Sequence, residues 1–351
     1  MMARYAWLGG LMLAIVVVVG VIVVVNSDKT KTLRIFIWEE YIDPEVYRLF
    51  EREFEAKVIE DNYGSNEDMR AKLQAGGAVY DLVVPSDYMV TLLRKDGLLL
   101  PIDLSRIPNL KHLAARFRDP IYDPGHRFSV PYQWGITGIG YNKRGVMPLP
   151  TRWADLFEPA YIEPYKNRIS MLNDMREVIG AALVAAGHSP ETTDPQHLAH
   201  AQTLLLQQKP FLAKYDSESF EDSLASGETV LAQGWSGEIA MAQAQNPDIA
   251  FVIPAEGTFL FVDNWAIPKG ARQKELAEDF MNFVLRPEIS AMIVNHARYA
   301  SVNEAATPLI KPEILNGPSY YWPEGTKLWW LNDFNDAGRL YERVWLELKG
   351  R

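Results

Sequence analysis

Short apolar runs alternate with amphipathic stretches along the chain from about residue 33 onward. Apolar runs of strand length cover 33–37, 57–60 and 81–84. Asp43 followed by Pro44 marks the start of a helix after the first run. Ser65 or Asn66 can cap a second helix, which Gly76 and Gly77 end. The order strand, helix, strand, helix, strand predicts a parallel sheet covered by helices on both faces.

The middle of the chain predicts a second lobe of the same α/β kind. Extended, largely apolar segments at 130–142 and 259–268 are suited to pass between lobes, and a third passage is expected near 302–307. Helical stretches are expected near 176–187, 194–208 and 219–226, with a strand at 229–233. The amphipathic stretch 274–285 follows the second passage and is expected to return the chain to the first lobe. The predicted division is 32–138 plus 262–303 for lobe 1 and 139–261 plus 304–351 for lobe 2.

The N-terminus has the pattern of a targeting segment. Arg4 precedes an apolar run from Leu8 to Val25, and polar residues follow from Asn26. The run is near the length that spans a bilayer, and no convincing small-x-small cleavage site precedes Asp28. Residues 1–30 are therefore predicted to be a signal peptide or an N-terminal membrane anchor. The rest of the chain is expected to be exported to the periplasm, free or tethered to the inner membrane.

The composition of the chain excludes some classes of ligand and chemistry. The 351 residues carry a formal net charge of -10, which disfavours nucleic-acid binding because phosphate recognition needs a basic face. An acidic field favours cationic ligands, although the same charge can simply keep a protein soluble. With no cysteines, the chain has no disulfide, no thiolate zinc site and no cysteine nucleophile.

Aromatic and acidic residues gather directly after the predicted strands. They are Trp38, Glu39, Glu40 and Tyr41, then Ser86, Asp87 and Tyr88, then Trp235 and Glu238, then Phe261 and Asp263. Ligands of open α/β sheets bind beyond the carboxyl ends of the strands, so these positions are expected to line one cleft. Each also has a simpler explanation, since rings pack, acids are solvated at helix starts, and Ser86 can be a helix cap.

A small organic polycation suits such a cleft. Each ammonium must exchange its water for carboxylates or neutral acceptors, so acids are needed at both ends of the ligand. The methylenes between the ammonium groups need apolar walls, which rings provide, and rings also attract cations. Asp263 is an acid within an otherwise apolar stretch, so it needs a partner, which either a structural ion pair or a bound ligand could supply.

Several stretches of the chain together resemble the spermidine/putrescine-binding proteins of polyamine ABC transporters. They are 37–41 (IWEEY), 81–86 (DLVVPS), 131–135 (PYQWG), 176–178 (REV), 234–238 (GWSGE) and 283–288 (FVLRPE), and the resemblance extends from Leu33 to Arg351. It implies a two-lobed periplasmic-binding-protein fold with crossover strands and the ligand in the interlobe cleft.

The resemblance also implies ligand contacts. Matching positions are Trp38, Glu40, Ser86 and Trp235, with further roles for Glu177, Glu238, Asp263 and Tyr299, and Asp174 completes the candidate set. Phe261 stands where spermidine-preferring members often have tryptophan, and Leu331 where they have a glutamine. Putrescine is therefore favoured over spermidine.

Three functional readings remain open at this point. The first is a monomeric receptor that delivers a polyamine to a membrane ABC permease by lobe closure, and the second is a sensor that signals to a membrane receptor. The third, a hydrolase using paired carboxylates, is disfavoured because no nucleophile, metal or cofactor motif accompanies them. His197 and His200 have metal-like spacing, but a solvated helix face explains them, so neither a metal nor a cofactor is expected.

Overall fold

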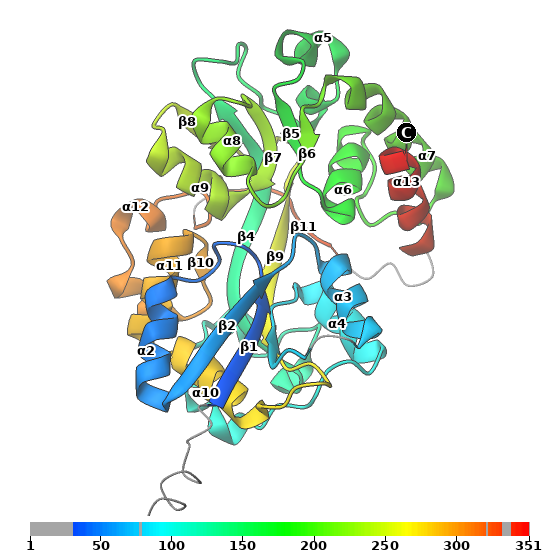
Figure 1. Cartoon of the computed structure of the whole chain (residues 1–351). Coiled ribbons are helices and arrows are strands. Elements are labelled where there is room, and N and C mark those ends of the chain that lie inside the picture. Colours follow the sequence, from blue (N-terminus) through cyan, green and yellow to red (C-terminus); the bar gives the residue numbers. More distant parts are fainter. Residues whose placement is uncertain (1–30, 77–78, 321, 332–337, 351) are drawn as a thin grey trace, which may run out of the picture.

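The computed structural model describes residues 31–350 apart from 77–78, 321 and 332–337, and it has two lobes joined by long strands (Figure 1). The segment predicted as a signal peptide or anchor, 1–30, lies outside the described residues. Within the part of the chain that is described, none of the helices combines the length and apolar character needed to cross a membrane.

The first lobe is built on a parallel sheet with helices between its strands. Its first elements are β1 (Lys31–Ile37), α2 (Pro44–Phe54), β2 (Ala56–Asn62), α3 (Asn66–Ala75), β3 (Leu82–Val83) and α4 (Asp87–Lys95). Strand β1 pairs in parallel with both β2 and β3, as predicted. Helix α2 begins at the expected place because the Asp43 side chain accepts the Glu45 N–H at 2.8 Å. Ser65 caps α3 in the same manner.

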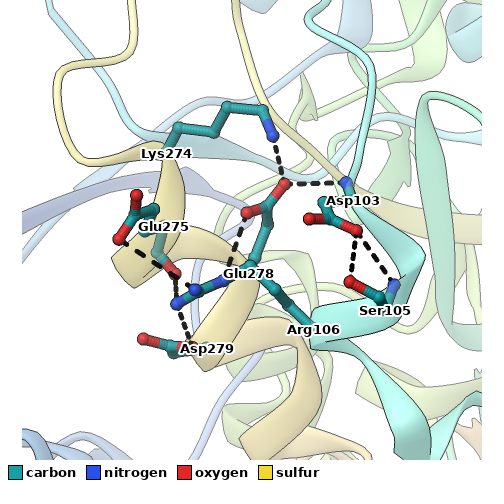
Figure 2. A network of polar contacts seen from close by, with 7 residues as sticks. All are labelled: Asp103, Ser105, Arg106, Lys274, Glu275, Glu278 and Asp279. Carbon is teal, nitrogen blue, oxygen red and sulfur yellow. Dashed lines mark hydrogen bonds and ion pairs between the residues drawn. The ribbon is translucent and has the colours of Figure 1, made fainter.

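A run of short 3-10 helices leads from α4 to the long strands. These are η1 (Leu104–Arg106), η2 (Pro108–His112), η3 (Ala115–Phe117) and η4 (Pro124–His126). A polar network fastens this run to α10 (Lys274–Val284), as Figure 2 shows. Its centre is Glu278, only 1% exposed, which accepts the Asp103 N–H at 2.8 Å and contacts both Arg106 and Lys274. This buried carboxylate has two cationic partners, and its role is structural.

Two long strands connect the lobes. Strands β4 (Ser129–Asn142) and β9 (Thr258–Ala266) pair antiparallel as far as Ile136, after which β4 pairs with β7 (Leu231–Trp235) and β8 (Ile249–Val252). At roughly 3.3 Å per residue, β4 is about 45 Å long, enough to belong to both sheets. Figure 1 shows both strands running from one lobe into the other. The two-lobed α/β fold with crossover strands is therefore confirmed.

The second lobe repeats the α/β arrangement. Its elements include η5 (Trp153–Leu156), α5 (Pro159–Ile162), η6 (Glu163–Tyr165), β5 (Ile169–Met171), α6 (Met175–Ala185), α7 (Pro195–Gln208), η7 (Lys209–Phe211), β6 (Lys214–Tyr215), α8 (Phe220–Ser226) and α9 (Ser236–Gln245). Strand β5 lies between β6 and β7 and is parallel to both. Strand β7 begins two residues later than the predicted 229–233, so Trp235 is its last residue.

The chain ends with a return to the second lobe. After α10 come α11 (Pro287–Ala297), β10 (Ala300–Ser301), η8 (Glu304–Leu309), α12 (Pro312–Leu315), β11 (Leu328–Trp330) and α13 (Gly338–Gly350). Ala306, Ile310 and Ile314 bury their side chains against Ala291 and Val294 of α11. Because of this apolar contact, the chain still packs on α11 after residues 302–307, where the passage to the second lobe is expected. Its next pairing with a long connecting strand is that of β11 with β9. The division into lobes stays a prediction, but this packing favours a later last passage.

Candidate ligand-binding site

A cavity of about 710 Å³, part of it open to solvent, lies between the two lobes. Its walls come from the ends of β1 and β3, from β7 and β9, and from the starts of α4, α6, α8 and α9. Every site residue predicted from the sequence lines it: Trp38, Glu39, Glu40, Tyr41, Ser86, Tyr88, Asp174, Glu177, Trp235, Glu238, Phe261, Asp263 and Tyr299. Residues up to 261 positions apart in the chain are thereby brought together at the carboxyl ends of strands.

Asp263 lies at the centre of a hydrogen-bond network. It is 3% exposed, and its two carboxylate oxygens accept the Ser86 and Tyr41 hydroxyl protons, each at 2.6 Å. Burial raises the pKa of Asp263 to about 6, while the two hydroxyl donors act in the opposite direction. The carboxylate is therefore mostly ionised at neutral pH and held in one orientation.

Ser86 and its neighbours hold this network from the first lobe. The Ser86 side chain makes no capping bond to α4, so the simpler explanation of this residue as a cap does not hold. Its hydroxyl also receives a bond from the Asn66 amide at 3.0 Å. The Tyr41 carbonyl accepts the Tyr132 hydroxyl at 2.8 Å, which fixes the loop after β1. Both donors to Asp263 are therefore themselves positioned.

Glu177 is a second buried carboxylate, contributed by α6. The Asp174 side chain caps this helix and accepts the Arg176 and Glu177 N–H groups at 2.9 and 3.1 Å. Glu177 Oε1 accepts the Trp235 indole N–H at 3.1 Å and the Thr137 hydroxyl at 2.9 Å. Its other oxygen is buried and has no hydrogen-bond partner within the described ranges of the chain. Burial first, and then the charge of Asp174, raise the pKa of Glu177 to about 8.

A contact between lobes joins Glu238 and Tyr299, where the tyrosine hydroxyl donates to the glutamate. Burial and the neighbouring Glu221 raise the pKa of Glu238 well above its ordinary value. The Tyr299 ring needs glycines beside it. A Cβ on Gly237 would lie 2.5 Å from ring atoms of Tyr299, and one on Gly135 would lie 2.8 Å from both Tyr299 and Phe261. Small residues at these two positions allow the ring to reach the cavity.

Aromatic rings form a continuous wall around the acids. Ring centroids are 5.8 Å apart for Trp38 and Trp235, 6.5 Å for Trp235 and Phe261, 5.9 Å for Phe261 and Tyr299, and 5.1 Å for Tyr299 and Tyr41. Each pair is in an edge-on arrangement, which leaves ring faces available. The Trp38 indole N–H donates to the Val84 carbonyl at 3.0 Å, so its ring is fixed.

The remaining predicted residues lie toward the rim or between the lobes. Glu39 and Glu40 are exposed, and Glu40 has a left-handed backbone with φ of 52° in the turn after β1. The guanidinium of Arg176, from the second lobe, lies 4.2 Å above the Tyr88 ring of the first lobe and 3.4 Å from Glu67. Tyr88 therefore contributes to the contact between lobes as well as to the cavity wall.

Six further residues line the cavity without being in the candidate set: Asn66, Asp87, Ser217, Glu218, Glu221 and Leu331. Asp87 belongs to the strand-end cluster described above. It is 4% exposed, and one of its oxygens is buried with no hydrogen-bond partner in the described structure. Burial raises its pKa to about 8. Glu221 has no local signal, because it lies within a short helix next to another acid, Asp222. Leu331 adds an apolar side chain to the wall.

The cavity is strongly acidic. Nine of the described residues that line the cavity are Asp or Glu. No Lys or Arg is found among the described lining residues. Buried carboxylates without cationic partners are costly, and their raised pKa values reflect that cost. The space between them is therefore matched to a ligand that brings positive charge and can lie against rings.

The side chains of the described residues do not form the arrangement that a metal site requires. Over the described residues, no group of three or more His, Asp or Glu side chains is placed to hold a metal ion. His197 and His200 lie on α7, outside the cavity lining. The His197 ring stacks on that of His188 with centroids 3.9 Å apart, and His200 shares a hydrogen bond of 3.2 Å with His188.

Two α/β lobes joined by crossover strands, with an aromatic and acidic cavity between them, are the architecture of solute-binding proteins. The family model described as bacterial extracellular solute-binding protein matches residues 46–318. The chain belongs to this family. Its relatives are substrate-binding proteins and not enzymes, so the expectation that the chain is not an enzyme is confirmed.

Named relatives align over nearly the whole chain. A putrescine/cadaverine-binding protein of Pseudomonas aeruginosa is 34% identical over 339 residues, which cover 93% of this chain and 96% of the relative. A spermidine/putrescine-binding periplasmic protein of Salmonella typhimurium is 36% identical over 328 residues, covering 92% and 93%. The Tp0655 (TpPotD) lipoprotein of Treponema pallidum has a solved structure with a TM-score of 0.78 and 34% identity, covering 92% of this chain and 100% of that one. The family resemblance predicted from the sequence is confirmed.

Proposed function

We propose that the protein binds a polyamine between its lobes, with putrescine favoured over spermidine, and presents it to an ABC permease. The observation that carries the proposal is the cavity itself, in which acids surround an aromatic space and none of the described lining residues is basic. The names of the relatives above support the same ligand class.

The physics of a diamine agrees with this arrangement. Four methylenes buried between Trp38, Trp235 and Phe261 would contribute roughly 3 kcal/mol, at about 0.8 kcal/mol each. One ammonium would be held by Asp263, and the other would lie among the remaining acids of the cavity, which include the unpartnered oxygen of Glu177. Leu331 and Phe261 keep part of the wall free of polar groups, which suits a short alkyl spacer without a central amine.

Closure of the lobes would complete the site. Both the Tyr299–Glu238 hydrogen bond and the Arg176–Glu67 ion pair join the two lobes beside the cavity. A ligand that bridges the lobes stabilises the closed form by its difference in affinity for the two forms. That closed form is what a permease, or in the alternative reading a membrane sensor, would recognise.

We further propose that residues 1–30 direct export to the periplasm, where the relative from Salmonella typhimurium is named as residing. They would then be removed or kept as an inner-membrane tether. Fractionation of cells that express the full chain would separate these outcomes, because a cleaved protein is released with the periplasm and shortened in mass, whereas a tethered one stays with membranes at full mass.

Calorimetric titration of the chain without its first 30 residues tests the ligand assignment. Putrescine, cadaverine, spermidine and spermine should each be tried, and putrescine should bind most tightly. An absence of heat and of thermal stabilisation with all four would contradict the proposal. Uptake of labelled putrescine by cells with and without the gene then separates delivery from sensing, since only delivery requires the protein for uptake.

A further inference from the structure

Glu221 has no role in the predicted site, yet the structure gives it the properties of a ligand-binding residue. It lies on α8, is 4% exposed, and lines the cavity. One of its carboxylate oxygens is fully buried and has no hydrogen-bond partner among the residues that the structure describes. A buried acid in this condition requires an explanation, because an unsatisfied charged oxygen destabilises the folded protein.

Over the described part of the chain, no cationic side chain compensates the charge of Glu221. The charged side chains that act on it most strongly, Asp222, Glu40 and Asp216, are all acidic. Lys214, from the neighbouring strand β6, is engaged with Asp216 at 3.1 Å. Burial raises the pKa of Glu221 to about 8, which is the expected response of a carboxyl group in such a position.

Glu221 also acts on a residue of the predicted site. After burial, the charge of Glu221 is the largest cause of the raised pKa of Glu238, and both side chains line the same cavity. Glu278 shows the contrast within the same protein, since that buried carboxylate contacts both Lys274 and Arg106. The Glu221–Glu238 pair lacks any such partner among the described residues, and the open space beside it is the cavity.

We propose that Glu221 and Glu238 together hold one ammonium group of the ligand, so that Glu221 is a further specificity-determining residue of the site. This inference rests on the proposed function. An ammonium group placed between two carboxylates neutralises their repulsion and satisfies the unpartnered oxygen at once. A ligand without a cation at this end would leave both acids unpaired, so the pair selects for charge at that position.

The test compares Glu221→Gln with Asp222→Asn. Asp222 is the next residue on α8, is exposed, and has a hydrogen bond to Gln245 at 3.3 Å, so its substitution removes the same charge on the side away from the cavity. Titration calorimetry with putrescine should show at least a tenfold weaker Kd for Glu221→Gln and less than a threefold change for Asp222→Asn. Titration in buffers of different ionisation enthalpy should show fewer protons released per putrescine bound by Glu221→Gln.

Thermal unfolding without ligand separates binding from folding. Glu221→Gln should be at least as stable as the parent protein at pH 8, because the substitution removes an unpaired buried charge. If the parent protein binds putrescine and Glu221→Gln binds it with the same affinity, the role of Glu221 is overturned while the proposed function stands. A parent protein that binds none of the four polyamines would overturn this inference together with the proposed function. A Glu221→Gln protein that binds weakly, is less stable and releases as many protons would show a structural role instead.

Discussion

Asp263→Asn is the sharpest perturbation of the proposed site. The substitution keeps the size of the side chain, removes its charge, and places an amide group where one hydroxyl now donates. Asp263 is 3% exposed, so an ammonium beside it would have little water to replace the lost carboxylate. Removing one partner of a buried, hydrogen-bonded charge pair costs about 2–5 kcal/mol, which corresponds to about a 30-fold to several-thousandfold weaker Kd.

The assay is titration calorimetry with putrescine at pH 7.5, with competition against a weaker amine if the parent Kd is too tight. Asp81→Asn is the matched control, because Asp81 is also buried, but its oxygens accept three backbone N–H groups, from Arg34, Arg272 and Gln273, away from the cavity. That variant should lose stability while its folded fraction keeps the parent affinity. A change below tenfold for Asp263→Asn would refute Asp263 as the principal ammonium partner.

The remaining predictions concern pH, packing and selectivity. Putrescine affinity should rise from pH 6 through pH 8 and level off only above pH 8, because the carboxyl groups of Glu177 and Glu221, each with a pKa of about 8, must lose their protons to hold ammonium groups. The ligand-free protein should lose thermal stability over the same range, since the folded state keeps protons that the unfolded state, with ordinary pKa values, releases at lower pH. A flat affinity profile would contradict the pH prediction. Gly237→Ala should lower both stability and affinity by displacing the Tyr299 ring, as measured by thermal unfolding and calorimetry. Leu331→Gln should strengthen spermidine binding relative to putrescine by adding a polar group to the wall, and an unchanged ratio of the two Kd values would count against that assignment.

Local patterns in the sequence determined most of the elements and the membership of the site. The start of α2 follows from Asp43 and Pro44, whose effect on the backbone depends only on residues a turn away. Very short strands such as β6 and β10 have no comparable pattern, because two residues cannot show a period. The family motifs predicted the strand-end acids and rings, since each of those lies beside a recognisable strand or helix start.

Only the tertiary structure decided how the site residues act on one another. The hydroxyls of Tyr41 and Ser86 meet Asp263 across 222 and 177 positions of the chain, and no local rule specifies those bonds. Glu221 and Asp222 are neighbouring acids that the sequence cannot distinguish, yet one is buried beside the cavity and the other is exposed. The pKa of a carboxyl group depends on burial and on charges brought close by distant segments, so it is a property of the folded chain and not of the local sequence.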